Sequence, residues 1–96
     1  NCTADMNKAI LHRLNDLLEN EKAAEARQLL NDIPPEESMD YWTVKAKIEQ
    51  KFQNWSGAIN AWSKVLEWDE TNVEAQNNSR IIRNILNFWN PEMFNP

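Results

Sequence analysis

The chain has 96 residues, of which 42% are hydrophobic and 26% charged, and its formal net charge is -5 at pH 7. This length supports one core, and the composition is that of an ordinary globular chain rather than a disordered or membrane-spanning one. The negative charge repels phosphate backbones and anionic headgroups, and no basic patch offsets it, so we expect no nucleic acid partner and no membrane-surface binding.

The only cysteine, Cys2, stands near the start of the chain and cannot form an internal disulfide. The stretch "CTAD" resembles the acylated start of a mature bacterial lipoprotein, which implies a lipid anchor at Cys2 and a periplasmic or membrane-anchored location. The other interpretation is an incidental free thiol in a cytoplasmic protein. The sequence leaves both open, and it contains no transmembrane segment.

Apolar residues recur every three or four positions in the first part of the chain, which predicts two short helices. They are Met6, Ile10, Leu14 and Leu17, and then Ala23, Ala26, Leu30 and Ile33. The paired prolines after Ile33 end the second helix, because proline cannot continue one. A single Gly and four Pro leave little material for hairpins, which favours a mostly helical chain.

The same spacing predicts three more helices in the rest of the chain. The third and fourth carry Tyr41, Val44, Ile48 and Phe52, and then Trp55, Ala58, Trp62 and Val65. The fifth opens at Thr71, whose spacing to Glu74 is that of a capping box, and it runs through Ile81, Ile82, Ile85 and Leu86. Helices of this length with short connections lie antiparallel to their neighbours.

A shift of 32 residues lays the first two predicted helices on the next two. The positions that then coincide are Ala23 with Trp55, Ala26 with Ala58, Leu30 with Trp62, Ala9 with Tyr41, Ile10 with Trp42 and Leu14 with Ala46. The chain is therefore a helix-pair repeat. Its period is close to the roughly 34 residues of tetratricopeptide repeats.

The stretch from Tyr41 to Asn72, "YWTVKAKIEQKFQNWSGAINAWSKVLEWDETN", resembles one tetratricopeptide repeat from end to end. The matching positions are Trp42, Ala46, Trp55, Ala58 and Trp62. Five residues depart from the family's pattern. Trp68 stands where an aliphatic residue is usual, and Glu70 stands where a proline is usual. Glu49 occupies a site that is usually aromatic, Gln53 replaces the turn glycine, and Gly57 lies inside a helix, where it costs up to about 1 kcal/mol relative to Ala.

The resemblance implies an all-α fold, an antiparallel helix-pair, right-handed solenoid of five helices in a single domain spanning 1–96. We expect repeat 1 at about 5–37, repeat 2 at about 38–71, a closing helix at about 72–89 and a tail at 90–96. The tail "NPEMFNP" follows Phe88 and Trp89, and we predict that it turns back to cover the closing helix. The alternatives are insertion into a neighbouring molecule and a frayed terminus.

Three of the five tryptophans lie between residues 55 and 68, either as a stacking surface for a ligand or as core. Trp55 and Trp62 are seven residues apart and share a helix face, whereas Trp68 faces elsewhere. In the repeat, Trp55 and Trp62 point between the paired helices and Trp68 points toward the following helix. We therefore predict that all three pack between helices rather than bind a ligand.

No catalytic constellation is visible. His12 is the only histidine and has no nucleophile beside it, and no cluster has metal-ligand spacing. Glu36, Glu37 and Asp40 precede the third helix, where negative charge stabilises a helix N-terminus. The sequence therefore predicts a non-enzymatic protein with no catalytic, cofactor or metal site.

The resemblance implies a protein-protein interaction module that holds a peptide or protein segment in a concave helical groove. The candidate partner-binding residues are His12, Asn15, Thr43, Lys47, Gln50, Asn77 and Asn78. The wider groove face also includes Lys8, Leu11, Asp40, Val44, Glu74 and Ile81. Leu11 and Glu74 stand where a C-terminal carboxylate clamp needs lysines, so that function is not expected. The alternatives are a solvated face and a self-associating, homodimerising domain.

Overall fold

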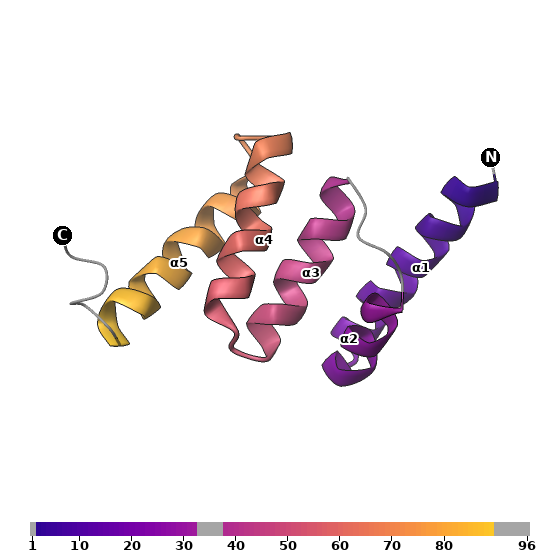
Figure 1. Cartoon of the computed structure of the whole chain (residues 1–96), viewed down its shortest axis with the longest axis horizontal. Helices are drawn as coiled ribbons and strands as arrows, with labels where there is room; N and C mark the ends of the chain where they lie inside the picture. The colour runs from indigo at the N-terminus through magenta and orange to yellow at the C-terminus, as the bar shows by residue number, and fades with distance from the viewer. Residues whose placement is uncertain (1, 33–37, 90–96) are drawn as a thin grey trace.

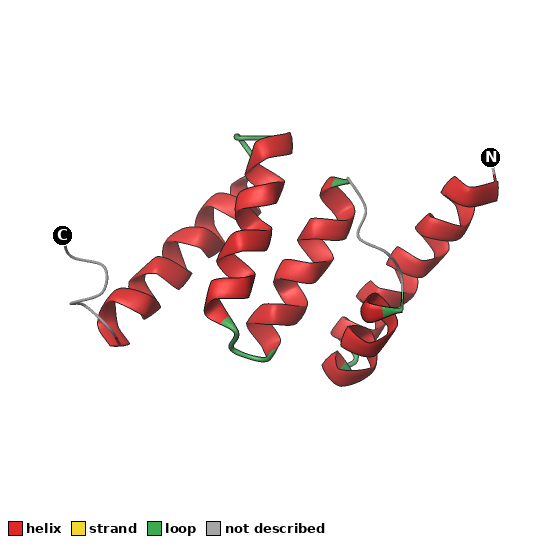
Figure 2. Cartoon of the chain, in the orientation of Figure 1, coloured by secondary structure: helices red, strands yellow, loops and turns green. Residues whose placement is uncertain are grey.

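The structure is a computed structural model that describes the backbone of residues 2–32 and 38–89. It contains five helices: α1 (Cys2–Glu19), α2 (Ala23–Asn31), α3 (Met39–Lys51), α4 (Trp55–Trp68) and α5 (Val73–Trp89) (Figure 1). The described ranges contain no strand (Figure 2). The prediction of an all-α chain with five helices is therefore confirmed, although α1 begins four residues before Met6.

The helices stand side by side, with α1 and α2 at one end, α3 and α4 in the middle and α5 at the other end (Figure 1). The overall extents of 49 × 27 × 20 Å describe an elongated molecule. The first helices of the pairs form a row, because α1 packs against α3 and the side chains of α3 reach α5 through an ion pair and a hydrogen bond. The residues that the sequence predicts to face a groove lie on these three helices.

Two apolar clusters hold the row together, and α3 contributes to both. The first lies between α1, α2 and α3 and consists of Leu14, Leu17, Leu18, Ala26, Leu30, Tyr41, Val44 and Ile48. The second lies between α3, α4 and α5 and consists of Ala46, Ala58, Ala61, Trp62, Val65, Ala75 and Ile82. Because opposite sides of α3 are buried in different clusters, α3 is the central element of the fold.

Both helix pairs close with the same turn. Glu21 and Gln53, which lie 32 residues apart, both adopt a left-handed backbone with φ of 59°. The next amide donates in each pair to a carbonyl five residues back, from Lys22 to Leu17 at 2.8 Å and from Asn54 to Glu49 at 2.9 Å. This hydrogen bond satisfies a carbonyl at the end of the helix, as in a Schellman motif. The 32-residue shift found in the sequence thus recurs in the backbone.

Side-chain caps begin three of the helices. Ser38 accepts from the amide of Tyr41 at 3.2 Å before α3, and Asn54 accepts from the amide of Gly57 before α4. Asn72 accepts from the amide of Ala75 at 2.9 Å before α5. The predicted cap at Thr71 is therefore wrong by one residue. The amide and hydroxyl of Thr71 instead donate to Asp69 Oδ1, at 3.0 and 2.6 Å.

Three of the departures from the repeat pattern, Glu49, Gln53 and Gly57, meet around the turn between α3 and α4. Gln53 supplies the left-handed residue of that turn, and Glu49 is only 7% exposed. The Glu49 carboxylate accepts from Asn54 Nδ2 and lies 3.9 Å from Arg27 Nη2 on α2. A Cβ at residue 57 would collide with Glu49 Oε2 and Asn54 Nδ2. The absence of a side chain at Gly57 therefore leaves room for the buried Glu49 carboxylate.

The predicted capping tail at 90–96 lies outside the described residues, as does the segment 33–37 with its paired prolines. On α5 itself, Ile81 is 53% exposed and Phe88 is 79% exposed. These two residues are seven apart and share a face of the helix. The closing helix therefore presents apolar side chains at the end of the row.

Candidate functional site

A polar cluster joins α3 to α5 at the centre of the predicted groove face. Lys47 Nζ lies 3.4 Å from Glu74 Oε2, and Gln50 Nε2 donates to Asn78 Oδ1 at 3.2 Å. We call these four residues the α3–α5 site. With Leu18, Lys51 and Trp62 they line a cavity of about 300 Å³. Lys47, Gln50 and Asn78 were predicted as partner-binding residues, and the structure brings them together.

The buried Trp62 fixes the position of this site. Its side chain is 1% exposed, and its indole Nε1 donates to Gln50 Oε1. The amide nitrogen of Gln50 is then directed at Asn78, whose own Nδ2 donates to the carbonyl of Glu74 at 2.8 Å. The predicted packing of Trp62 between the paired helices is confirmed. Its polar atom also orients the groove amides.

The other four predicted residues make their polar interactions within their own helices. His12 pairs with Asp16 at 3.8 Å, and Asn15 Nδ2 donates to the carbonyl of Leu11 at 3.1 Å. Thr43 Oγ1 donates to the carbonyl of Met39, and Asn77 Oδ1 accepts from Arg80 Nη2, both at 2.8 Å. The structure therefore does not join these four to the α3–α5 site. On the wider face, Val44 is buried in the first cluster rather than exposed to the groove.

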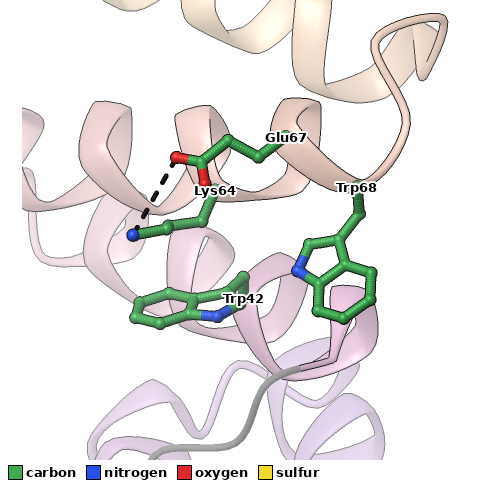
Figure 3. Close-up of a pocket in the computed structure, with 4 residues that line it drawn as sticks. All are labelled: Trp42, Lys64, Glu67 and Trp68. Carbon is green, nitrogen blue, oxygen red and sulfur yellow. Dashed lines mark ion pairs between the residues drawn. The ribbon is translucent and has the colours of Figure 1, made fainter.

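The prediction for Trp68 is wrong. Its side chain is 55% exposed, so it is not buried between helices. Trp68 instead lines a cavity of about 390 Å³ together with Trp42, Lys64 and Glu67, and we call these four residues the tryptophan pocket (Figure 3). Trp55 is half-buried against the second cluster, as predicted. One of the three tryptophans therefore belongs to a surface rather than to the core.

The tryptophan pocket is formed where the start of α3 meets the end of α4. Trp42 is half-buried and packs edge-on against Tyr41, with ring centroids 5.1 Å apart and planes at 89°. Lys64 Nζ lies 6.0 Å from the Trp42 ring centroid and 3.9 Å from Glu67 Oε2. Figure 3 shows the Lys64 side chain extending above Trp42, with Trp68 standing beside them. An ammonium group thus already occupies part of this pocket.

A second cavity, of about 510 Å³, continues the tryptophan pocket along the seam between α3 and α4. It shares Trp42, Lys64 and Glu67 with the first cavity and adds Lys45, Glu49, Gly57, Asn60, Ala61 and Ser63. The seam therefore offers an elongated depression with mixed polar walls. It lies on a different face of α3 from Lys47 and Gln50, because Trp42 and Lys47 are five residues apart on the helix.

Negative charge gathers at the end of α4 beside Trp68. Asp69 and Glu70 follow the helix, and its last turn contains no basic residue. The Thr71 hydroxyl, and then its backbone amide, donate to Asp69 and hold the pKa of that carboxyl below its ordinary value. Asp69 is therefore ionised at neutral pH. The carbonyl end of a helix also favours cations within the adjacent turn.

Among the side chains that the structure describes, those of residues 8–32 and 38–88, no group of three His, Cys, Asp or Glu residues lies close enough to hold a metal ion. None of the helices in these ranges is both long and apolar enough to cross a membrane. No family model matches the sequence, and comparisons with curated proteins and with solved structures find no match either.

Proposed function

We propose that this chain is a non-enzymatic interaction module that binds a peptide or protein segment along the groove face of α1, α3 and α5. The observation that carries the proposal is the convergence of Lys47, Gln50, Glu74 and Asn78 over one cavity. Two amides and two opposite charges form a surface that can bond to both the N–H and C=O groups of an extended polypeptide.

The α3–α5 site combines an ordered part with an exchangeable part. Gln50 is held between the indole of Trp62 and the amide of Asn78, so little side-chain entropy remains to be lost when a ligand binds. Lys47 and Glu74 are both partly exposed, and an ion pair of that kind stabilises by only about 0–1 kcal/mol. A ligand that offers its own charges can therefore replace this pair at little expense.

We further propose that the architecture is a tetratricopeptide-like, right-handed solenoid whose first helices line the concave side. The 32-residue recurrence of the turn and the row formed by α1, α3 and α5 support this proposal. In helical repeat proteins such a row forms an extended binding surface. The groove would then continue along α1, past His12 and Asn15.

The test is selection of binders from a random peptide library with the purified chain, followed by titration of the winning peptide into variants. Lys47→Glu replaces the ammonium group of the α3–α5 site by a carboxylate and should weaken binding at least about tenfold, because a ligand group that pairs with Lys47 is then repelled. Lys22→Glu makes the same charge change on an exposed residue of the first turn and should leave binding unchanged. Thermal stability should be nearly the same for both variants. Equal weakening by both, or no selected peptide at all, would contradict the proposal.

The alternative function is self-association, and the exposed Ile81 and Phe88 on α5 favour it. Two such faces would bury each other in a symmetric dimer. Light scattering at micromolar concentration separates the two functions. A monomer removes the alternative, whereas a dimer that Ile81→Lys dissociates without unfolding supports it.

A further inference from the structure

The tryptophan pocket has the components of a cation site. Trp42 and Trp68 supply two indole rings, and Glu67 supplies a carboxylate beside them (Figure 3). An indole face attracts a cation within about 6 Å of its centroid, and the attraction strengthens when water is partly excluded. A cavity of about 390 Å³ leaves space between these groups for a side chain from another molecule.

The surroundings of the pocket also favour positive charge. Trp68 is the last residue of α4, so the negative, carbonyl end of that helix lies beside it, and no basic residue stands in the last turn. Asp69 and Glu70 add two carboxyl groups immediately after the helix. The whole chain carries -5 at pH 7, which adds a long-range attraction for cationic ligands.

Lys64 places a cation in the tryptophan pocket, and this ammonium group is weakly held. Its ammonium lies at 6.0 Å from the Trp42 centroid and 3.9 Å from Glu67, both at the outer limits of such contacts. The Lys64 and Glu67 side chains are 50% and 68% exposed, so Lys64 can turn toward solvent with little loss. The ammonium therefore acts as an exchangeable stand-in for a ligand cation.

The same chain already holds an arginine in this kind of environment. The Arg27 guanidinium lies 4.6 Å from the centroid of the Phe52 ring and 3.9 Å from the Glu49 carboxylate. This is an aromatic ring and a glutamate around one guanidinium, built between α2 and the α3–α4 turn. The tryptophan pocket repeats the ring and the glutamate and adds a second, exposed indole, but it contains no arginine.

We propose that the tryptophan pocket binds an arginine side chain of a partner polypeptide, with the guanidinium over the indoles, the Glu67 carboxylate as its counter-charge and the partner backbone along the α3–α4 seam. Arginine fits better than lysine because its planar group stacks on aromatic faces and bonds a carboxylate with two N–H groups. Asn60 and Ser63 line the seam and offer polar groups to the adjacent backbone. This site is separate from the α3–α5 site and does not depend on it.

The experiment titrates the acetylated, amidated peptide Gly-Arg-Gly into the intact chain and follows the five indole N–H signals by NMR. The matched probe is Gly-citrulline-Gly, which has nearly the same shape but no charge. We expect the arginine peptide to shift the signals of Trp42 and Trp68 and to leave Trp62 in place. The citrulline peptide should bind at least about fivefold more weakly, since it loses the cation–π attraction and the charge pair.

Three variants separate a built site from general charge attraction. Glu67→Gln should weaken the arginine peptide about two- to fivefold, and Trp68→Ala should do the same. Lys64→Met should strengthen it by a similar factor, because the internal competitor is removed. The control Glu25→Gln makes the same charge change on α2 and should have no effect.

The result that overturns the proposal can appear in any of these comparisons. Equal binding of the arginine and citrulline peptides removes the role of charge. Equal weakening by Glu67→Gln and Glu25→Gln reduces the effect to net charge, and weaker binding by Lys64→Met shows that Lys64 is not a competitor. Because Glu67 and Trp68 are largely exposed, these variants should keep the wild-type circular dichroism melting curve. If the library yields no peptide for the groove while arginine still binds at the tryptophan pocket, only the proposed groove function fails.

Discussion

The two helix pairs share a turn but differ in how their second helices are held. Glu21 and Gln53 give both turns the same left-handed residue. After the turn, α2 has 9 residues and no side-chain cap at Lys22, whereas α4 has 14 residues and is capped by Asn54. The same turn therefore forms whether or not the helix after it is long and carries a side-chain cap.

This difference separates two sources of order. The turn follows from backbone hydrogen bonds that any residue can make, so it tolerates Glu and Gln in place of the usual glycine. The stability of each helix pair depends on the large apolar side chains that it buries, since helices in proteins are stabilised mainly by packing of an apolar face. The position of Leu30 in α2 is taken by Trp62 in α4, and the second pair buries the larger residue. We therefore expect the second pair to be the more stable half.

The largest expected effect comes from these two equivalent positions. Trp62→Ala should lower the free energy of unfolding by about 3–5 kcal/mol, as deletion of a buried large aromatic does. Leu30→Ala should lower it by about 2 kcal/mol, at the low end for its class because the short α2 can move to fill the space. Urea unfolding followed by circular dichroism measures both. A loss below about 1 kcal/mol for Trp62→Ala, or a larger loss for Leu30→Ala, would reverse the ranking of the two pairs.

Gly57 provides a test that only the second pair offers. Helix propensity alone predicts that Gly57→Ala stabilises by about 1 kcal/mol. The new methyl group would instead collide with the Glu49 carboxylate and the Asn54 cap, so we expect a loss of about 1–2 kcal/mol. The measurement is the free energy of unfolding from urea titration.

A double-mutant cycle identifies the cause of the Gly57 effect. In the Glu49→Ala background the carboxylate is gone and no longer holds Asn54 Nδ2 in place, so Gly57→Ala should become neutral or stabilising. The same loss in both backgrounds would mean that the buried carboxylate does not determine the need for glycine. The departure from the repeat pattern at residue 57 would then have another origin.

Much of the fold could be predicted because the spacing of apolar residues indicates which face of each helix is buried. The five apolar segments matched the five helices, and the resemblance placed Lys47, Gln50 and Asn78 on the face where they meet. The start of α5 was wrong by one residue because Thr71 and Asn72 are both good caps, and the competing bond to Asp69 was not visible in the sequence. Local chemistry thus predicted the elements better than their boundaries.

The tryptophan pocket was missed for a different reason. Spacing indicates that Trp68 leaves the face of Trp62, but not whether a neighbouring helix covers it. In the structure α5 packs on α4 through Ala75 and Ile82, and the indole of Trp68 lies instead near Trp42, 26 residues earlier. A juxtaposition of that kind depends on how α3 and α4 align along their length. No spacing along the sequence indicates which residue lies beside Trp68.

Because both helix pairs have the same turn, substitutions at the two turns should change stability by equal and smaller amounts. Glu21→Gly and Gln53→Gly should each stabilise by about 0.5–1 kcal/mol, because glycine relieves the left-handed strain although it also loosens the unfolded chain. Gln28→Gly, inside α2, is the control and should destabilise by about 1 kcal/mol. Melting temperatures rank all three. A gain at one turn and a loss at the other would show that the turns are not equivalent despite their matching hydrogen bonds.

The smallest expected effect is a pH dependence at the end of the second pair, where no counterpart exists among the described residues of the first. The Thr71 hydroxyl and then its amide lower the pKa of Asp69 below its ordinary value of 3.8. A carboxyl with a depressed folded pKa stabilises the fold above its unfolded pKa, and this contribution is lost as the pH falls through the folded value.

Thr71→Val keeps the amide bond and removes the hydroxyl, so the pKa of Asp69 should rise part of the way toward 3.8. A carbon-13 NMR titration of the carboxyl measures that rise, and Asp69→Asn, which has no carboxyl, is the control for melting curves at acid pH. An unchanged pKa in Thr71→Val would mean that the hydroxyl makes no bond in solution, and the turn after Trp68 would then be ordered by the backbone amides of residues 71 and 72 and by the Asn72 cap.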